Sequence, residues 1–129
     1  MTSGYLLDTQ VLHWMGESSK MLGPRVNQIL RSKPLFFCSI SVAELGFKKR
    51  FSRLHYDLSA PENWLELGIA PLNFGIEAAN AFSRFSPEWV PDPFDRQIMA
   101  IAAANNLTLI TSDRKILSQQ FDWVMDATT

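Results

Sequence analysis

The chain has 129 residues, of which 47% are hydrophobic and 19% charged, a composition that excludes a disordered polymer and suits one domain over residues 1–129. Its net charge of -1 excludes a nucleic-acid binder that relies on bulk positive charge alone. A single cysteine, Cys38, excludes an intramolecular disulfide.

The sequence shows no signal for export or for membrane insertion. Its first residues lack a charged segment followed by a long apolar one, so we expect no signal peptide. No apolar stretch approaches the ~18 residues that would span a bilayer. We therefore expect a cytoplasmic protein that has no membrane partner.

In the first half of the chain, apolar runs alternate with stretches of helical periodicity. Ser41 and Glu44 have the spacing of a capping box, which predicts the start of a helix. The expected elements are a strand at Leu6–Leu7, a short helix capped by Thr9, a helix opened by Gly23-Pro24 and ended by Pro34, a strand at Leu35–Cys38, and a helix from about Val42 to Arg53.

The second half continues the alternation after a connector at residues 54–60. Pro71 favours an edge position for its strand, and Asp92-Pro93 is typical of a helix N-terminus. The expected elements are a helix from Pro61 through Leu67, a strand at Ile69–Leu72, a helix from Phe74 to Phe85, a helix from Pro93 to Asn106, a strand at Leu107–Ile110, a short helix through Leu117, and a last edge strand at Phe121–Met125. This order predicts an α/β fold with a mostly parallel sheet and helices on both faces.

Four acidic residues occupy equivalent places at the ends of predicted strands or starts of helices. Asp8 follows the first strand, Glu44 lies in the turn after the second, Asp95 opens the clearest helix, and Asp113 follows the strand that contains Ile110. In an open parallel sheet these positions share the carboxyl edge, where ligands bind. Carboxylates that converge without an intervening Lys or Arg repel one another, and all-oxygen ligands suit Mg²⁺ or Mn²⁺.

Such a metal site can activate a water molecule and stabilise the leaving oxygen of a phosphodiester. We therefore predict that Asp8, Glu44, Asp95 and Asp113 are both the metal ligands and the catalytic residues.

Four stretches containing these acids resemble the ordered motifs of PIN-domain ribonucleases, most closely the VapC-like toxins of bacterial toxin–antitoxin pairs. The stretches are Leu6-Leu7-Asp8-Thr9, Ser41-Val42-Ala43-Glu44, Asp92-Pro93-Phe94-Asp95-Arg96 and Leu109-Ile110-Thr111-Ser112-Asp113. The resemblance implies a PIN-like three-layer α/β/α sandwich, endonucleolytic RNA cleavage that depends on Mg²⁺ or Mn²⁺, and inhibition by a cognate antitoxin protein. We also expect a homodimer.

The resemblance assigns a role to each acid. Asp8 would be the central ligand, Asp95 and Asp113 would complete the metal sites, and Glu44 would bind metal through water or orient the attacking water. Thr9 and Thr111 would hydrogen-bond these acids. The chain departs from the closest subgroup at Gln10, Ala43 and Val90-Pro91, positions where that subgroup often has His, Trp and His-Arg. These departures concern RNA contact and antitoxin pairing, and none removes an acid.

Helix capping is the competing interpretation of the acids, because carboxylates at helix N-termini are stabilising without a metal. Glu44 fits a capping box, Asp95 and Asp113 fit first helical turns, and Asp92 is predicted to be an N-cap that could also support the site. Asp8 has no comparable explanation in the sequence, so it is the strongest candidate for a ligand.

Other side chains have two open interpretations each. Lys48, Lys49, Arg50 and Arg53 could contact phosphates or could end a helix, and Arg96 could contact a phosphate or pair with an acid. A set of large apolar residues could pack in the core or form a groove for an antitoxin segment. This set comprises Phe47, Phe51, Leu54, Tyr56 and Trp64.

Two other classes of function compete with the ribonuclease. One is a catalytically silent PIN-like module that binds protein or RNA. The other is a phosphotransfer enzyme, but a dehalogenase-like phosphatase would need a second aspartate where the chain has Gln10.

Overall fold

The computed structural model describes residues 2–51 and 60–129, apart from the side chain of Phe51. Its described strands form one five-stranded sheet with the order β3-β2-β1-β4-β5, and every pairing is parallel. The strands are β1 (Tyr5–Leu7), β2 (Leu35–Cys38), β3 (Ala70–Leu72), β4 (Thr108–Thr111) and β5 (Val124–Asp126). The predicted parallel sheet is confirmed, with β3 and β5 at its edges as expected.

The order of the strands creates a switch point beside β1. From β1 the chain adds β2 and then β3 on one side, and it later returns to add β4 and β5 on the other. Leu6 is therefore paired with Phe36 on one side and with Leu109 on the other. The carboxyl ends of β1, β2 and β4 meet at this point, which is where a ligand is expected in such a sheet.

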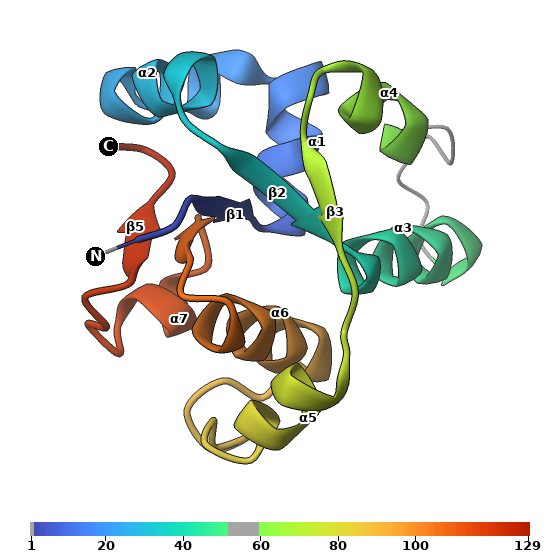
Figure 1. Cartoon of the computed structure of the whole chain (residues 1–129), viewed down its shortest axis with the longest axis vertical. Coiled ribbons are helices and arrows are strands. Elements are labelled where there is room, and N and C mark those ends of the chain that lie inside the picture. The colour runs from blue at the N-terminus through green and yellow to red at the C-terminus, as the bar shows by residue number, and fades with distance from the viewer. Residues whose placement is uncertain (1, 52–59) are drawn as a thin grey trace.

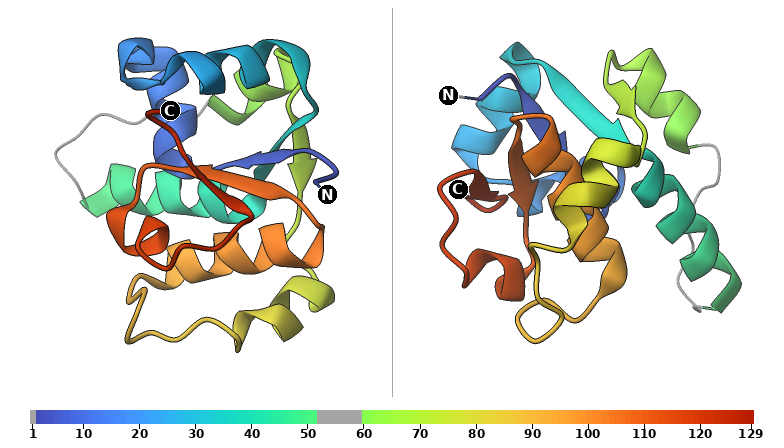
Figure 2. Two further views of the ribbon diagram at one scale, coloured as in Figure 1. Left: turned by 90° about the vertical axis from the view of Figure 1, so that its left-hand side faces the viewer. Right: turned by 60° about the horizontal axis from the view of Figure 1, so that its bottom comes forward.

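Helices cover both faces of the sheet and make three layers. Figure 1 shows α1, α2 and α4 above the strands and α5 and α6 below them, and the left view of Figure 2 shows the same layers from the side. The helices are α1 (Thr9–Glu17), α2 (Pro24–Ser32), α3 (Ser39–Phe51), α4 (Ala60–Glu66), α5 (Ile76–Phe82), α6 (Pro93–Ala104) and α7 (Arg114–Leu117), with a 3-10 turn, η1, at Ser19–Met21.

Alternate strand residues supply two separate cores. Leu6 and Leu109 pack in one cluster with residues of α5, α6 and α7, whereas Leu7 and Ile110 pack in another with residues of α1, α2 and α4. Successive side chains of a strand point to opposite faces, so both faces of the central strands are buried. The predicted three-layer α/β/α architecture is confirmed.

Two predicted helix starts are wrong. Helix α3 begins at Ser39, directly after β2, so Ser41 lies inside the helix and does not cap it. Helix α1 is capped by Asp8, whose side chain accepts a hydrogen bond from the backbone N–H of Thr9. Both differences arise because each strand passes into its helix with almost no connecting loop.

Other boundaries agree more closely with expectation. Asp92 caps α6 and Asn105 ends it, as predicted, while α5 is shorter than the predicted helix from Phe74 to Phe85. The end of the predicted third helix at Arg53 and most of the connector fall outside the described residues. No helix within residues 2–51 and 60–129 is long and apolar enough to cross a membrane.

Candidate active site

The four predicted acids line one pocket at the carboxyl edge of the sheet. The pocket has a volume of about 170 Å³. Its lining consists of Asp8, Thr9, Gln10, Glu44, Lys48, Asp92, Asp95, Ser112 and Asp113. The structure thus brings together side chains from the ends of β1 and β4 and from helices α3 and α6.

Asp8 lies at the end of β1, where both of its carboxylate oxygens accept hydrogen bonds. Its side chain is 5% exposed, and its Oδ1 accepts a hydrogen bond of 2.8 Å from the Thr9 N–H. Its Oδ2 accepts a bond of 2.6 Å from the hydroxyl of Thr111. The pKa of Asp8 is raised to about 6, chiefly by burial and also by the charges of Glu44 and Asp113, against the opposing effect of these two hydrogen bonds.

The cap that Asp8 provides corrects the expectation that this residue has no structural explanation. An aspartate at an N-cap is ordinary, but its near-complete burial beside two other acids is not. The burial and the neighbouring charges, rather than the position after the strand, are therefore what mark Asp8 as a candidate ligand.

Glu44 is buried, with 3% of its surface exposed, on the first turns of α3. Its Oε1 accepts a hydrogen bond of 2.6 Å from the Thr9 hydroxyl, which also lies 2.8 Å from Ser41 Oγ. Its Oε2 lies 3.0 Å from Lys48 Nζ. Both carboxylate oxygens thus have side-chain partners, whereas the glutamate of a capping box would accept a hydrogen bond from the backbone N–H of the N-cap residue.

Lys48 contradicts the expectation that the acids converge without an intervening cation. It lies one helical turn beyond Glu44 and lines the same pocket. The sequence contained a signal for this contact, because residues four apart on a helix face each other. From the sequence Lys48 is expected to contact a phosphate or to end a helix, and the structure adds this ion pair.

Asp95 is the least engaged of the four acids. It lies in the first turn of α6, and no described residue forms a hydrogen bond or ion pair with its carboxyl group. Burial raises the pKa of Asp95 to about 8, and the charges of Asp8, Asp92, Asp113 and Glu44 raise it in the same direction. A carboxyl group in this environment either holds a proton or needs a cation beside it.

Asp113 combines a cap with a place in the pocket. Its Oδ1 accepts hydrogen bonds of 2.9 Å from the N–H groups of both Lys115 and Ile116, which begins α7. Its own N–H donates to Thr111 Oγ1 over 3.1 Å, and the Thr111 hydroxyl donates to Asp8. Thr9 and Thr111 therefore hydrogen-bond the acids, as the family resemblance implied.

A larger hollow of about 630 Å³ adjoins the pocket and shares three of its acids. Arg114 and Lys115 lie on its wall, and Arg114 pairs with Asp126 at 3.1 Å.

Arg96 does not line this hollow, and its guanidinium lies 5.0 Å from the centre of the Phe82 ring. Among the described residues Arg96 forms no ion pair with an acid, so that interpretation of it is not supported.

Comparison of the sequence with models of known protein families gives a match that includes the four motifs. The family model for the PIN domain matches residues 5–121, a range that begins at β1 and includes all four acids. The chain belongs to the PIN domain family. No curated protein matches the chain.

Solved structures similar to this PIN domain come from toxin–antitoxin complexes. VapBC-1 from nontypeable Haemophilus influenzae has 22% identity and a TM-score of 0.66, and the match covers 97% of this chain and 98% of the other. A Klebsiella pneumoniae toxin–antitoxin complex has 20% identity and a TM-score of 0.66, with 95% and 97% covered. Rickettsia felis VapBC2, bound to a promoter DNA fragment, has 16% identity and a TM-score of 0.64, with 95% and 97% covered. At these identities the likeness establishes the fold.

The donor set of the pocket fits a hard divalent cation. Its acids are oxygen ligands, and burial together with neighbouring acids raises the pKa values of Asp8 and Asp95, so that a cation would favour their ionised forms. As the side chains stand, no three His, Cys, Asp or Glu residues of the described chain are placed to hold one ion. Binding would therefore require the carboxylates to move closer together.

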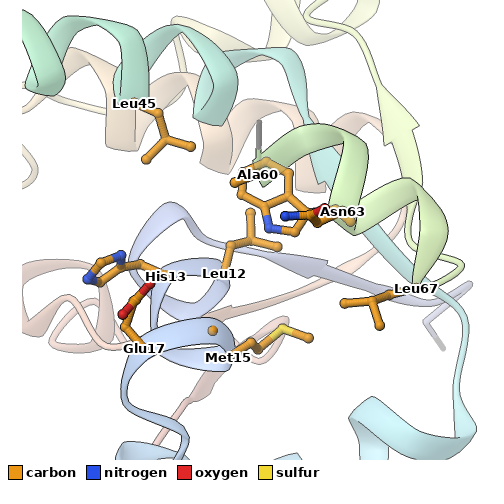
Figure 3. Close-up of a pocket in the computed structure, with 10 residues that line it drawn as sticks. Leu12, His13, Met15, Glu17, Leu45, Ala60, Asn63 and Leu67 are labelled. Atoms are coloured by element: carbon orange, nitrogen blue, oxygen red, sulfur yellow. The ribbon is translucent and has the colours of Figure 1, made fainter. Parts of the chain in front are cut away.

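A separate apolar pocket of about 200 Å³ lies between α1 and α4. Figure 3 shows Leu12 and Met15 of α1 on one side of it and Ala60, Asn63 and Leu67 of the α4 segment on the other, with Leu45 of α3 above. Trp64 also lines this pocket but is buried against Phe37, which confirms a core role for it.

Phe47, by contrast, is 52% exposed and lies 5.7 Å from the ring of Phe94. It is therefore not a core residue. Leu54, Tyr56 and the side chain of Phe51 fall outside the described residues.

Proposed function

We propose that this PIN domain is a metal-dependent endoribonuclease that hydrolyses RNA phosphodiester bonds and acts as the toxin of a toxin–antitoxin pair. The observation that supports it most directly is the convergence of Asp8, Glu44, Asp95 and Asp113 on one pocket. Two of these acids have pKa values raised by burial and by mutual repulsion. Such an arrangement is costly for folding and gains its purpose when a cation binds.

The residues have distinct parts in the proposed hydrolysis. A bound Mg²⁺ or Mn²⁺ supplies a polarised water and neutralises charge on the phosphate. Asp8, Asp95 and Asp113 would hold the ion, with Asp8 kept in position by Thr111 and by the backbone of Thr9.

Glu44 has the part of orienting the attacking water. The Thr9 hydroxyl fixes one of its oxygens at 2.6 Å, so the carboxylate has a defined direction. Its burial at the base of α3 keeps it beside the pocket rather than in solvent. This assignment matches its hydrogen bonding better than direct ligation does, since both oxygens already have partners.

The first prediction is that the purified protein cleaves RNA when Mn²⁺ or Mg²⁺ is present and does not when EDTA is added. The physical reason is that the acids alone repel the phosphate, whereas a divalent cation attracts it. The measurement is the appearance of internal cleavage fragments from a labelled single-stranded RNA. A single-stranded DNA of the same sequence is the control for sugar specificity. Fragments that form equally well in EDTA would contradict the proposal.

A catalytically silent binding module is the second candidate. The observation that favours it is the ion pair of Glu44 with Lys48, which occupies one of the four acids with a cation of the chain's own. It predicts RNA or protein binding without fragments in the same assay, at every concentration of Mn²⁺.

The proposed partner is a cognate antitoxin that places an apolar segment in the pocket between α1 and α4. The similar solved structures are toxin–antitoxin complexes, and the pocket is lined by Leu67, an apolar side chain that is largely exposed. Leu67 is 69% exposed, and Leu65, also exposed at 51%, lies on the neighbouring α4. Exposed apolar groups around a pocket are typical of a surface that a partner covers.

The second prediction concerns this surface. Leu67→Asp should weaken binding of the antitoxin at least about tenfold, because a carboxylate would be buried against apolar groups. Calorimetry with the antitoxin encoded beside the gene measures the effect. Ile76→Asp is the matched control, since Ile76 is 79% exposed at the start of α5, away from the pocket. Equal losses in both variants, or none in Leu67→Asp, would contradict the assignment.

A further inference from the structure

Lys48 is the positively charged member of a pocket that is otherwise lined by acids and neutral groups. Its ammonium group lies 3.0 Å from Glu44 Oε2, and its side chain is 37% exposed while that of Glu44 is 4% exposed. The two residues are four apart on α3, a spacing that places them on the same face of the helix. The ion pair thus joins a buried carboxylate to a cation at the mouth of the pocket.

The proposed hydrolysis does not explain this cation. A buried carboxylate without a partner is strongly destabilising, and among the described residues Glu44 has one neutral donor, the Thr9 hydroxyl, besides Lys48. Asp8 and Asp95 have no ion pair with a described residue, and their pKa values are raised. Within the described chain, Glu44 therefore has a positively charged partner, whereas Asp8 and Asp95 have none.

We propose that Lys48 is a built-in counter-ion that stabilises Glu44 when no metal is bound and lowers the affinity of the pocket for a divalent cation. The inference rests on the proposed metal site. A divalent ion among the acids would carry twice the charge of Lys48 and would repel it across the pocket. The same ammonium group that stabilises the metal-free protein therefore opposes metal binding.

This double role predicts two effects of opposite sign for Lys48→Gln. The metal-free variant should have a lower melting temperature than the wild type, because Glu44 loses its counter-ion. Its affinity for Mn²⁺ should rise roughly tenfold, because a positive charge near the site is gone. A residue with a purely structural role would give the first effect without the second.

Titration calorimetry with MnCl₂ alone, in the absence of RNA, tests the inference together with melting curves of the metal-free proteins. Lys48→Arg keeps the charge and should keep the affinity near that of the wild type. Lys49→Gln removes the same charge from an exposed neighbour that does not line the pocket, and solvent screening should limit its effect to less than about twofold.

The outcomes separate this inference from the proposed function. Tighter Mn²⁺ binding by Lys48→Gln but not by Lys49→Gln supports it, as does Mn²⁺ binding that appears only in Lys48→Gln. Equal affinity in Lys48→Gln and the wild type overturns the counter-ion role and leaves the nuclease proposal standing. If neither protein binds Mn²⁺, the metal site is absent and both proposals are wrong.

Discussion

The variant Asp8→Asn is expected to lose at least about 10³-fold in the rate of RNA cleavage. Asp8 is the acid at the centre of the switch point, and it is hydrogen-bonded through both oxygens. Asparagine keeps its size but removes the negative charge that would hold the cation. Rates of fragment formation at saturating Mn²⁺ measure the loss.

This substitution leaves the fold largely undisturbed, which makes the result interpretable. Asparagine is as good an N-cap as aspartate, so the bond from the Thr9 N–H to the side-chain oxygen can be kept. The Thr111 hydroxyl can rotate and accept a bond from the new amide. Asp122→Asn, an exposed substitution outside the acid pocket, is the matched control and should retain full activity. Cleavage by Asp8→Asn within tenfold of the wild type would show that Asp8 holds no essential metal.

The order of strands and helices could be predicted from the sequence because short local patterns mark these elements. Leu6-Leu7 and Leu109-Ile110 are continuous apolar pairs, as expected of strands buried on both faces. Asp92-Pro93 specifies the start of α6 through a side-chain cap and a fixed proline φ angle. These signals depend on neighbouring residues alone, so no knowledge of the folded chain was needed to use them.

The capping alternatives that the sequence suggests for Asp8 and Glu44 are the reverse of what the structure has. The sequence suggested a cap for Glu44 and none for Asp8, yet Asp8 caps α1 and Glu44 is buried inside α3. The cause is that α3 starts at Ser39, two residues before the capping-box serine. Where a helix starts depends on how its strand pairs and packs, which a four-residue motif does not contain.

The contact of Lys48 with Glu44 shows a different limit. Their spacing on a helix was visible, but the strength of the pair depends on Glu44 being buried and Lys48 lying at the pocket mouth. The buried Glu44 also accepts a hydrogen bond from Thr9, whose hydroxyl lies beside Ser41, so residues of α1 and α3 meet here. Contacts between separate segments of this kind come from the three-dimensional fold and not from local periodicity.

Asp95→Asn is expected to stabilise the metal-free protein at pH 8 by roughly 1–3 kcal/mol. Burial and four neighbouring acids raise the pKa of Asp95 to about 8 in the folded state. An unfolded chain would release that proton near pH 4. Between these values the folded state holds more protons than the unfolded state, so the free energy of unfolding of the wild type falls as pH rises from about 4 to about 8.

Asparagine removes this titration without breaking a hydrogen bond to a described residue, since Asp95 has none. The gain over the wild type should therefore be largest at pH 8 and should approach zero near pH 4. Glu77→Gln is the matched control, because Glu77 is an exposed acid in the first turn of α5. That variant should lose about 0.3–1 kcal/mol of helix-dipole stabilisation at neutral pH.

Mn²⁺ should reverse the order of the two proteins at pH 8. Metal binding stabilises the folded wild type by an amount that grows with the logarithm of the ratio of the Mn²⁺ concentration to the Kd for Mn²⁺. Asp95→Asn lacks one ligand and binds the ion more weakly, so it gains less. Melting curves with and without Mn²⁺ at pH 5 and pH 8 measure both effects. If Asp95→Asn instead melts below the wild type without metal, and Mn²⁺ shifts neither protein, Asp95 is a helix-dipole acid and not a ligand. If the wild type is less stable than Asp95→Asn without Mn²⁺ and more stable with it, the cation relieves the repulsion that the neighbouring acids exert on Asp95.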